Sequence, residues 1–334
     1  MHAPSVFQPM LRVVLCIWVP LFTVSASAAL ASPLRAQASR LDRNDDEFTG
    51  LPRHREPTDI RVTFLGTTSF VIRGAGHTLI IDGFFSRPSR SELLGRIEPN
   101  PYAILGGLLR AGVVRADALF VSHTHYDHAL DSATVAQFVG ARLMGSSSLA
   151  QLASAYGLPP ARVVQITKPT TFQFGRLAVR AIPWRHSPDA VFEGPIEAPP
   201  QLPARTSSYR EGTVYSYLVS NNRSHVLIIP SANYITNALN GVQADTVFLS
   251  IGQLGRQSDK FIATYWDQTV ARVGAKTVIP IHWDDFTKPL TQPLEPFPAP
   301  VDRIQRAQQA LQGLADRHGV KLIMPHAYQV FRIR

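Results

Sequence analysis

The feature that most constrains this chain is a string of three histidines and an aspartate that follows a short apolar strand. The string is His123-Thr-His-Tyr-Asp-His128, and the apolar residues 118–122 lead directly into it. These side chains cannot all face one way on a strand or a helix, but on a loop at a strand end they can converge on cations. Imidazole suits zinc, copper, iron and nickel, and a carboxylate adds a hard anionic ligand. The string therefore predicts a metal site.

Cysteine content limits what else can bind a metal. The chain has a single cysteine, Cys16, so it can form no intrachain disulfide and no thiolate cluster. Any metal chemistry must use nitrogen and oxygen ligands.

Cys16 lies in an N-terminal stretch that has the pattern of a secretory signal peptide. An opening with one arginine, Arg12, is followed by an apolar run at residues 13–24 and by small residues at 25–31. The run is shorter than the roughly 20 residues that span a bilayer, which favours cleavage, after Ala28 or Ala31, over an uncleaved membrane anchor. An exported chain without cysteine suits the periplasm or secretion.

The rest of the chain divides into a lead-in and a folded part. Residues 32–58 are polar and carry three prolines, which predicts a flexible lead-in before a domain at 59–334. The domain alternates strand and helix patterns twice. Strands are predicted at residues 60–65, 69–73, 77–82, 118–122, 141–144, 163–166, 172–174 and 177–182, and then at 214–219, 226–229, 246–250 and 277–281. Helices are predicted at 101–111, 132–139 and 262–273.

This order of elements predicts an α/β fold of four layers. Two successive sets of strands with outer helices would form two sheets packed face to face, an αββα sandwich.

Two further histidines lie, like the histidine string, just past the end of a predicted strand. His186 follows the strand at 177–182, and His282 follows the strand at 277–281.

These residues resemble the metallo-β-lactamase-fold hydrolases. The resemblance rests on Gly66, Asp82-Gly83, the histidine string, His186 and Pro280-Ile-His-Trp-Asp-Asp285, and it covers residue 59 to the C-terminus. The most similar branch contains ascorbate-6-phosphate lactonase and the N-acylethanolamine-releasing phospholipase D. The resemblance implies that one zinc binds His123, His125 and His186, and that a second binds Asp127, His128 and His282. It leaves Mn2+ and Fe2+ open as the metal, and it implies the αββα fold that the strands indicate independently.

One position departs from the family pattern. The family usually carries an aspartate that bridges both metals after a strand, whereas here Ser231-Ala-Asn233 stands in that place. Asparagine is neutral and has one acceptor oxygen, so it bridges two cations poorly. We therefore expect either a weakly held second metal or a single metal. Asp284 and Asp285 are the carboxylates that could compensate, although ordinary loop roles suit them better.

A zinc-bound hydroxide is the expected nucleophile. Zinc lowers the pKa of its bound water to about 7, so hydroxide can attack an ester, lactone or phosphodiester at neutral pH. Asp127 would orient that water and move its proton. Aromatic residues flank the proposed ligands and are candidates for binding substrate or for packing in the core: Tyr126, Trp184, Tyr234 and Trp283.

Three alternatives remain. The chain could be a non-catalytic metal-binding protein whose second site has degenerated at Asn233. It could be a di-iron redox enzyme of the same fold, although 334 residues leave no room for the flavin domain that such enzymes normally use. It could be a true β-lactamase, which the predicted signal peptide would suit, but Pro280-Ile-His-Trp283 and Asn233 argue against this.

The charge of the chain indicates the kind of partner. The net charge is +9, spread without basic runs, so no nucleic-acid partner is expected. It mildly favours an anionic substrate, either a small molecule or a lipid-like one. The proline-rich segment 187–212 predicts either a loop over the site or an insertion of no consequence. The sequence predicts no stable membrane span in the cleaved chain and indicates no oligomeric state.

Overall fold

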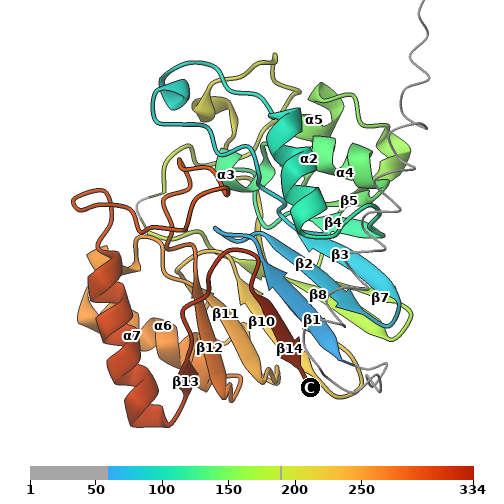
Figure 1. Cartoon of the computed structure of the whole chain (residues 1–334). Coiled ribbons are helices and arrows are strands. Elements are labelled where there is room, and N and C mark those ends of the chain that lie inside the picture. Colours follow the sequence, from blue (N-terminus) through green and yellow to red (C-terminus); the bar gives the residue numbers. More distant parts are fainter. Residues whose placement is uncertain (1–58, 189) are drawn as a thin grey trace, which may run out of the picture.

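Two seven-stranded sheets lie at the centre of the protein, packed face to face (Figure 1). The computed structural model describes residues 59–188 and 190–334. The predicted signal peptide at 1–31 and the lead-in at 32–58 lie outside these residues. Within the described part of the chain, no helix is long and apolar enough to cross a membrane.

The first sheet begins with three consecutive antiparallel strands, as predicted, and continues with parallel ones. Its strands, in spatial order, are β14 (Val330–Ile333), β1 (Ile60–Phe64), β2 (Phe70–Gly74), β3 (His77–Ile81), β4 (Ala118–Phe120), β5 (Arg142–Gly145) and β6 (Val163–Gln165). Strand β14 was not predicted. It pairs antiparallel with β1, so the end of the chain completes the first sheet.

The second sheet corrects the simple division of the strands into two successive sets. Its order is β13 (Lys321–Leu322), β12 (Thr277–Ile281), β11 (Thr246–Ser250), β10 (His225–Ile229), β9 (Val214–Ser220), β8 (Leu177–Trp184) and β7 (Thr170–Phe174). The first-half strands β7 and β8 belong here, because β8 pairs antiparallel with β9 over residues 178–184 and β7 pairs with β8. The chain therefore changes sheets after β6.

Helices cover the two outer faces (Figure 1). On the first sheet lie α2 (Pro101–Arg110), α4 (Ser132–Val139) and α5 (Ser147–Ala155), with the single turn α3 (Tyr126–Ala129) at the strand ends. On the second lie α6 (Asp259–Trp266), its continuation η5 (Asp267–Ala271) and α7 (Ile304–His318). Local sequence explains the start of α2, where Pro101 is the first residue and the Asn100 side chain accepts the N–H groups of Tyr102 and Ala103. Helix α5 was not predicted.

Three separate apolar clusters confirm the four layers. The central one lies between the sheets and takes alternate strand residues such as Val62, Phe64 and Phe248. The two outer clusters lie between each sheet and its helices. The αββα sandwich is therefore confirmed. Its strand ends meet at one edge, where the candidate ligands lie.

Candidate metal centre

All six predicted metal ligands lie just past strand ends, and the fold brings them together. His123 follows β4 of the first sheet, while His186 and His282 follow β8 and β12 of the second. They form two groups of three: His123, His125 and His186, and Asp127, His128 and His282. Within each group the three ligand atoms lie within 4.8 Å of one another. These are the two sets that the resemblance implied.

The loop that carries the histidine string is tied to the opposite sheet. The carbonyl of Ser122 accepts the N–H of Tyr215 at 2.8 Å, and the carbonyl of Val121 accepts the Tyr217 hydroxyl at 2.6 Å. After His125 the chain turns into α3, which brings Asp127 and His128 inward, both buried. The two sheets therefore hold the string from both sides before any metal binds.

The first group has the spacing of zinc ligands. His125 Nδ1 lies 3.1 Å from His186 Nε2. Two nitrogens on one tetrahedral zinc would lie about 3.3 Å apart, given zinc–nitrogen distances of about 2.05 Å. His123 Nε2 is buried without a hydrogen-bond partner. Since buried nitrogen atoms are normally partnered, these atoms fit a shared cation.

In His186 and His123, the ring nitrogen that faces away from the other ligands lies near neighbouring oxygens. His186 Nδ1 lies 3.1 Å from the hydroxyl and 3.2 Å from the carbonyl of Ser187. His123 Nδ1 lies 3.3 Å from the hydroxyl of Ser122. Such contacts fix the ring orientation and leave the inner nitrogen free for a metal.

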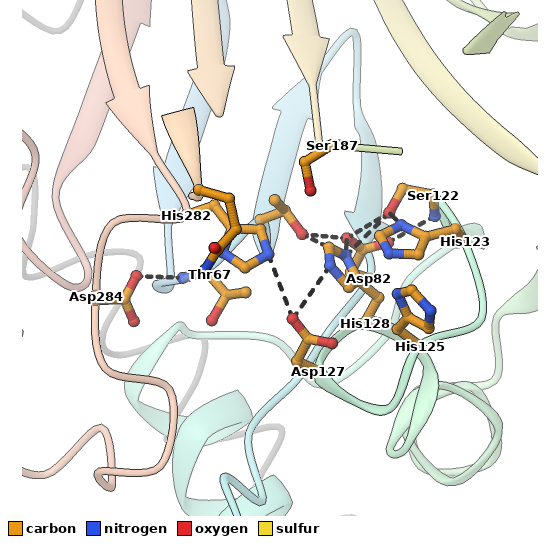
Figure 2. Close-up of polar contacts among 12 residues, drawn as sticks. Thr67, Asp82, Ser122, His123, His125, Asp127, His128, Ser187, His282 and Asp284 are labelled. Atoms are coloured by element: carbon orange, nitrogen blue, oxygen red, sulfur yellow. Dashed lines mark hydrogen bonds and ion pairs between the residues drawn. The ribbon is translucent and has the colours of Figure 1, made fainter. Parts of the chain in front are cut away.

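The second group is centred on a carboxylate. Asp127 Oδ2 lies 3.4 Å from His128 Nε2 and 3.3 Å from His282 Nε2 (Figure 2). These distances again match the edge of a tetrahedron around zinc, about 3.3 Å. One oxygen and two nitrogens can therefore hold a second cation.

Asp82 orients His128 from behind. Its fully buried carboxylate lies 2.8 Å from His128 Nδ1, and it also accepts the Ser122 N–H at 2.7 Å and the Thr68 hydroxyl. A carboxylate on the outer nitrogen fixes the tautomer and makes the imidazole a more basic ligand. The sequence pointed to Asp82 only as part of the family pattern, and the structure shows what it contacts.

The charges of the two groups differ. Burial lowers the pKa of each imidazole in the first group, that of His186 to about 3. Burial also lowers the pKa of His128, but the carboxylates of Asp127 and Asp82 outweigh it and raise that pKa to about 9. Burial raises the pKa of Asp127, yet the charge and hydrogen bond of His128 hold it well below its usual range.

The structure does not aim Asn233 at the ligands. Its Nδ2 donates to the carbonyl of His186 at 2.6 Å, and its Oδ1 accepts the N–H of Tyr234 at 2.8 Å. Both amide groups are thus used on the backbone beside a ligand. Asp284 and Asp285 do not replace it, because Arg87 and Thr67 contact the first and Arg90 and Thr287 contact the second.

The aromatic candidates lie near the ligands, mostly inside packed clusters. Trp184 and Trp283 are buried in the outer cluster of the second sheet, which favours core packing over substrate contact. Tyr126 packs against Phe84 and Phe286. Tyr234 stacks near Phe261. A substrate-binding role for any of them stays a prediction.

The segment that follows His186 is docked on the histidine string. The N–H of Thr124 donates to the carbonyl of Glu211 at 2.9 Å, and the Thr124 hydroxyl donates to that carbonyl at 3.0 Å. Further along, Ile97 and Ala204 form an isolated β-bridge. The described residues of 187–212 therefore pack next to the loop that carries the ligands.

Comparison with known proteins defines the class. A family model described as Beta-lactamase superfamily domain matches residues 77–283, more than half of the chain. The chain belongs to this superfamily and has the metallo-β-lactamase fold, as the resemblance indicated.

Several relatives carry the name UPF0173 metal-dependent hydrolase. The protein from Myxococcus xanthus is 30% identical over 154 residues, which are 46% of this chain and 46% of that protein. The protein from Staphylococcus aureus is 24% identical over 232 residues, 68% of this chain and 87% of that protein. The chain thus spans about half the length of the first relative.

Solved structures share the fold at low identity. Igni18, a metallo hydrolase from Ignicoccus hospitalis, is 13% identical with a TM-score of 0.53, covering 83% of this chain and 99% of its own. An isothiocyanate hydrolase from Delia radicum gut bacteria is 13% identical with a TM-score of 0.52, covering 81% and 98%. CmlA, a diiron β-hydroxylase from Streptomyces venezuelae, is 15% identical with a TM-score of 0.50, covering 83% and 55%.

Proposed function

We propose that the chain is an exported metal-dependent hydrolase that cleaves an ester, lactone or phosphodiester bond. One observation carries the proposal: six donor atoms converge as two groups of three at the shared edge of the sheets. Superfamily membership and the names of the relatives support hydrolysis. The predicted signal peptide supports export to the periplasm or secretion, with an uncleaved membrane anchor as the alternative.

The chain's own residues divide the work. Bound zinc would supply hydroxide at neutral pH and stabilise developing negative charge. His123, His125 and His186 would hold the first metal, and Asp127, His128 and His282 the second. Asp127 is buried in the second group, and burial lowers the pKa of the neighbouring His123 and His125 while the charge of Asp127 opposes that shift. A carboxylate in this position would orient the attacking water and accept its proton.

The substrate we propose is anionic, either a small molecule or a lipid-like one. The net charge of +9 supports it, because a positive field attracts anions. We expect kcat/KM to fall as ionic strength rises. A flat dependence would contradict an anionic substrate.

A non-catalytic metal-binding protein is the second candidate. Asn233 favours it, because the amide is turned to the backbone and no aspartate bridges the groups. A protein that binds metal but hydrolyses nothing in a panel of esters, lactones and phosphodiesters would support this candidate.

Metal content per chain tests the metal centre on which both candidates rest, and the hydrolysis panel separates them. The protein is purified without chelator, and zinc, iron and manganese are measured by elemental mass spectrometry beside an Asn233→Asp variant. An aspartate cannot donate to the His186 carbonyl, so it should turn toward the ligands. Asn240→Asp, at an exposed turn position, is the matched control.

Each outcome is informative. Two equivalents in the parent would support a binuclear enzyme that tolerates Asn233. One equivalent that rises to two in Asn233→Asp alone would support a mononuclear enzyme. No bound metal would overturn the proposal.

A further inference from the structure

A buried ion pair lies behind the second ligand group. Arg87 Nη2 lies 2.6 Å from Asp284 Oδ2, and both side chains are almost wholly buried, at 1% and 0% exposure. Two charges taken out of water are costly unless their geometry is close and their remaining hydrogen-bonding groups are used. A buried ion pair of this kind therefore suggests a structural or functional role, and its contacts indicate which role.

The contacts of the pair lead to a proposed metal ligand. Asp284 Oδ1 accepts the N–H of Thr67 at 2.8 Å, and Arg87 Nη2 donates to the Thr67 hydroxyl at 3.1 Å. The carbonyl of Thr67 then accepts the N–H of His282 at 2.8 Å. In Figure 2, Asp284 lies on the side of His282 away from His123 and His125, and a dashed line joins it to Thr67 beside His282.

The backbone is strained at Thr67 and at His282, the two residues joined by the last of these bonds. Thr67 has φ 51° and His282 has φ 55°, in the left-handed region that residues with a side chain seldom adopt. Such conformations persist only where the surrounding contacts hold them. The Arg87 guanidinium also packs directly on Gly66, where an added Cβ would lie 2.2 Å from Nη2. Only glycine leaves room for it.

We propose that the Arg87–Asp284 pair is a positioning element for the second metal. It holds the turn at Thr67, which holds the backbone of His282 in the conformation that turns Nε2 toward Asp127. Asp284 is not itself a ligand, since Thr67 and Arg87 occupy its oxygens. Arg87 and Asp284 are positioning residues, and loosening either should weaken the second site and spare the first. This inference rests on the proposed metal centre.

Zinc binding at buffered free concentrations tests the pair in Arg87→Lys and Asp284→Asn. We expect the second-site affinity to fall by about tenfold, the lower end of the effect of losing a direct outer contact to a ligand, because the pair reaches His282 only through Thr67. The first-site affinity should stay at its parental value. Arg90→Lys is the matched control, because Arg90 makes a similar 2.7 Å pair with Asp285 but its side chain is 58% exposed. It should bind as the parent does.

A double variant separates positioning from folding. Arg87→Met with Asp284→Leu replaces the pair by apolar side chains, a change that often leaves folding stability unaltered or raised. Because Asp284→Leu also leaves the buried Thr67 N–H without its acceptor, we expect a metal-free protein that still folds, with an unfolding temperature below the parental one and a weakened second site. A folded double variant that binds two zinc ions as tightly as the parent would overturn the inference alone. A parent that binds fewer than two metals would overturn the binuclear centre, and this inference with it.

Discussion

The two ligand groups lie side by side but differ in charge and in what holds them. The first contains three imidazoles, and burial lowers the pKa of each, so they are neutral at pH 7. The second contains Asp127 and a His128 whose pKa is raised to about 9 by Asp127 and Asp82. Metal ligands must be deprotonated. The first group is therefore ready for a cation, whereas the second must release a proton.

The two groups share the loop at residues 123–128, but different contacts hold their ligands in place. His123 and His125 depend on hydrogen bonds from the second sheet and from the segment that follows His186. His128 and His282 depend instead on buried carboxylates, Asp82 and Asp284. The sites can therefore be perturbed separately, and the predictions below use this.

The largest expected effect is the loss of a ligand. His186→Ala leaves two nitrogens in the first group, fewer than the three protein ligands that catalytic zinc sites use. We expect the first metal and hydrolysis to be lost, with the second metal retained, as measured by elemental mass spectrometry and turnover. His326→Ala, at an exposed position, is the control. Loss of both metals would show that the sites are not separable.

Asp82→Asn should weaken the second site more than the first, because Asp82 contacts His128 directly and reaches His123 only through Ser122. The amide cannot serve both the Ser122 N–H and His128 Nδ1 as the carboxylate does, so His128 loses its fixed orientation. We expect a second-site affinity about 10–100-fold lower by zinc titration. Asp117→Asn, which alters the partly exposed contact to His77 at 3.2 Å, should change neither site. An equal loss at the first site would break the comparison.

Zinc affinity should depend on pH at the second site. His128 is protonated below a pKa of about 9, and the metal must displace that proton. Second-site affinity should fall by about tenfold per pH unit below about 9, while the first site changes little between pH 7 and 9. Isothermal titration in buffers of different ionisation enthalpy would measure the released proton. Equal pH dependence at both sites would contradict the assignment.

The same group should affect the metal-free protein in the opposite direction. A pKa raised from 6.5 to about 9 by folding stabilises the folded state below pH 6.5, and this contribution is lost as pH rises through 9. We expect the unfolding temperature of the metal-free protein to fall between pH 6.5 and 9. His128→Gln should flatten that decline.

The smallest expected effect is at Thr124. Thr124→Val removes hydroxyl bonds to the carbonyls of Arg210 and Glu211, while the backbone bond to Glu211 remains. Urea unfolding should show a loss of about 1 kcal/mol, typical for one hydrogen-bonded group, with a few-fold weaker first site. Thr170→Val, which removes an exposed bond to the Lys168 carbonyl, is the control. A weaker second site would contradict the separation.

Much of the fold could be predicted because its strands are apolar runs bounded by turns. Strands β1 to β3 and the helix α4 lie where periodicity placed them. Which strands pair with one another could not be predicted from these local patterns. Strand β14 pairs with β1 from the other end of the chain, and β7 and β8 pair within the second sheet. Local patterns carry no information about such long-range pairing.

The site shows the same division. His186 and His282 could be found because each follows an apolar strand, and the family pattern then grouped them with the string. Arg87 could not be found, because an arginine after Phe84-Phe85-Ser86 carries no local sign of a partner 197 positions away. Asp284 was set aside as a loop carboxylate for the same reason.

The sequence by itself determined most of the elements and the ligand types, because strand period, turn residues and donor chemistry are local properties of the chain. Only the tertiary structure decided which atoms of those ligands converge, where Asn233 points and what holds His282. These depend on contacts between strand ends that are far apart in sequence. Burial then set the charges, because the pKa of His128 and of the three imidazoles in the first group depends on the water excluded and the carboxylates brought near when the two sheets pack.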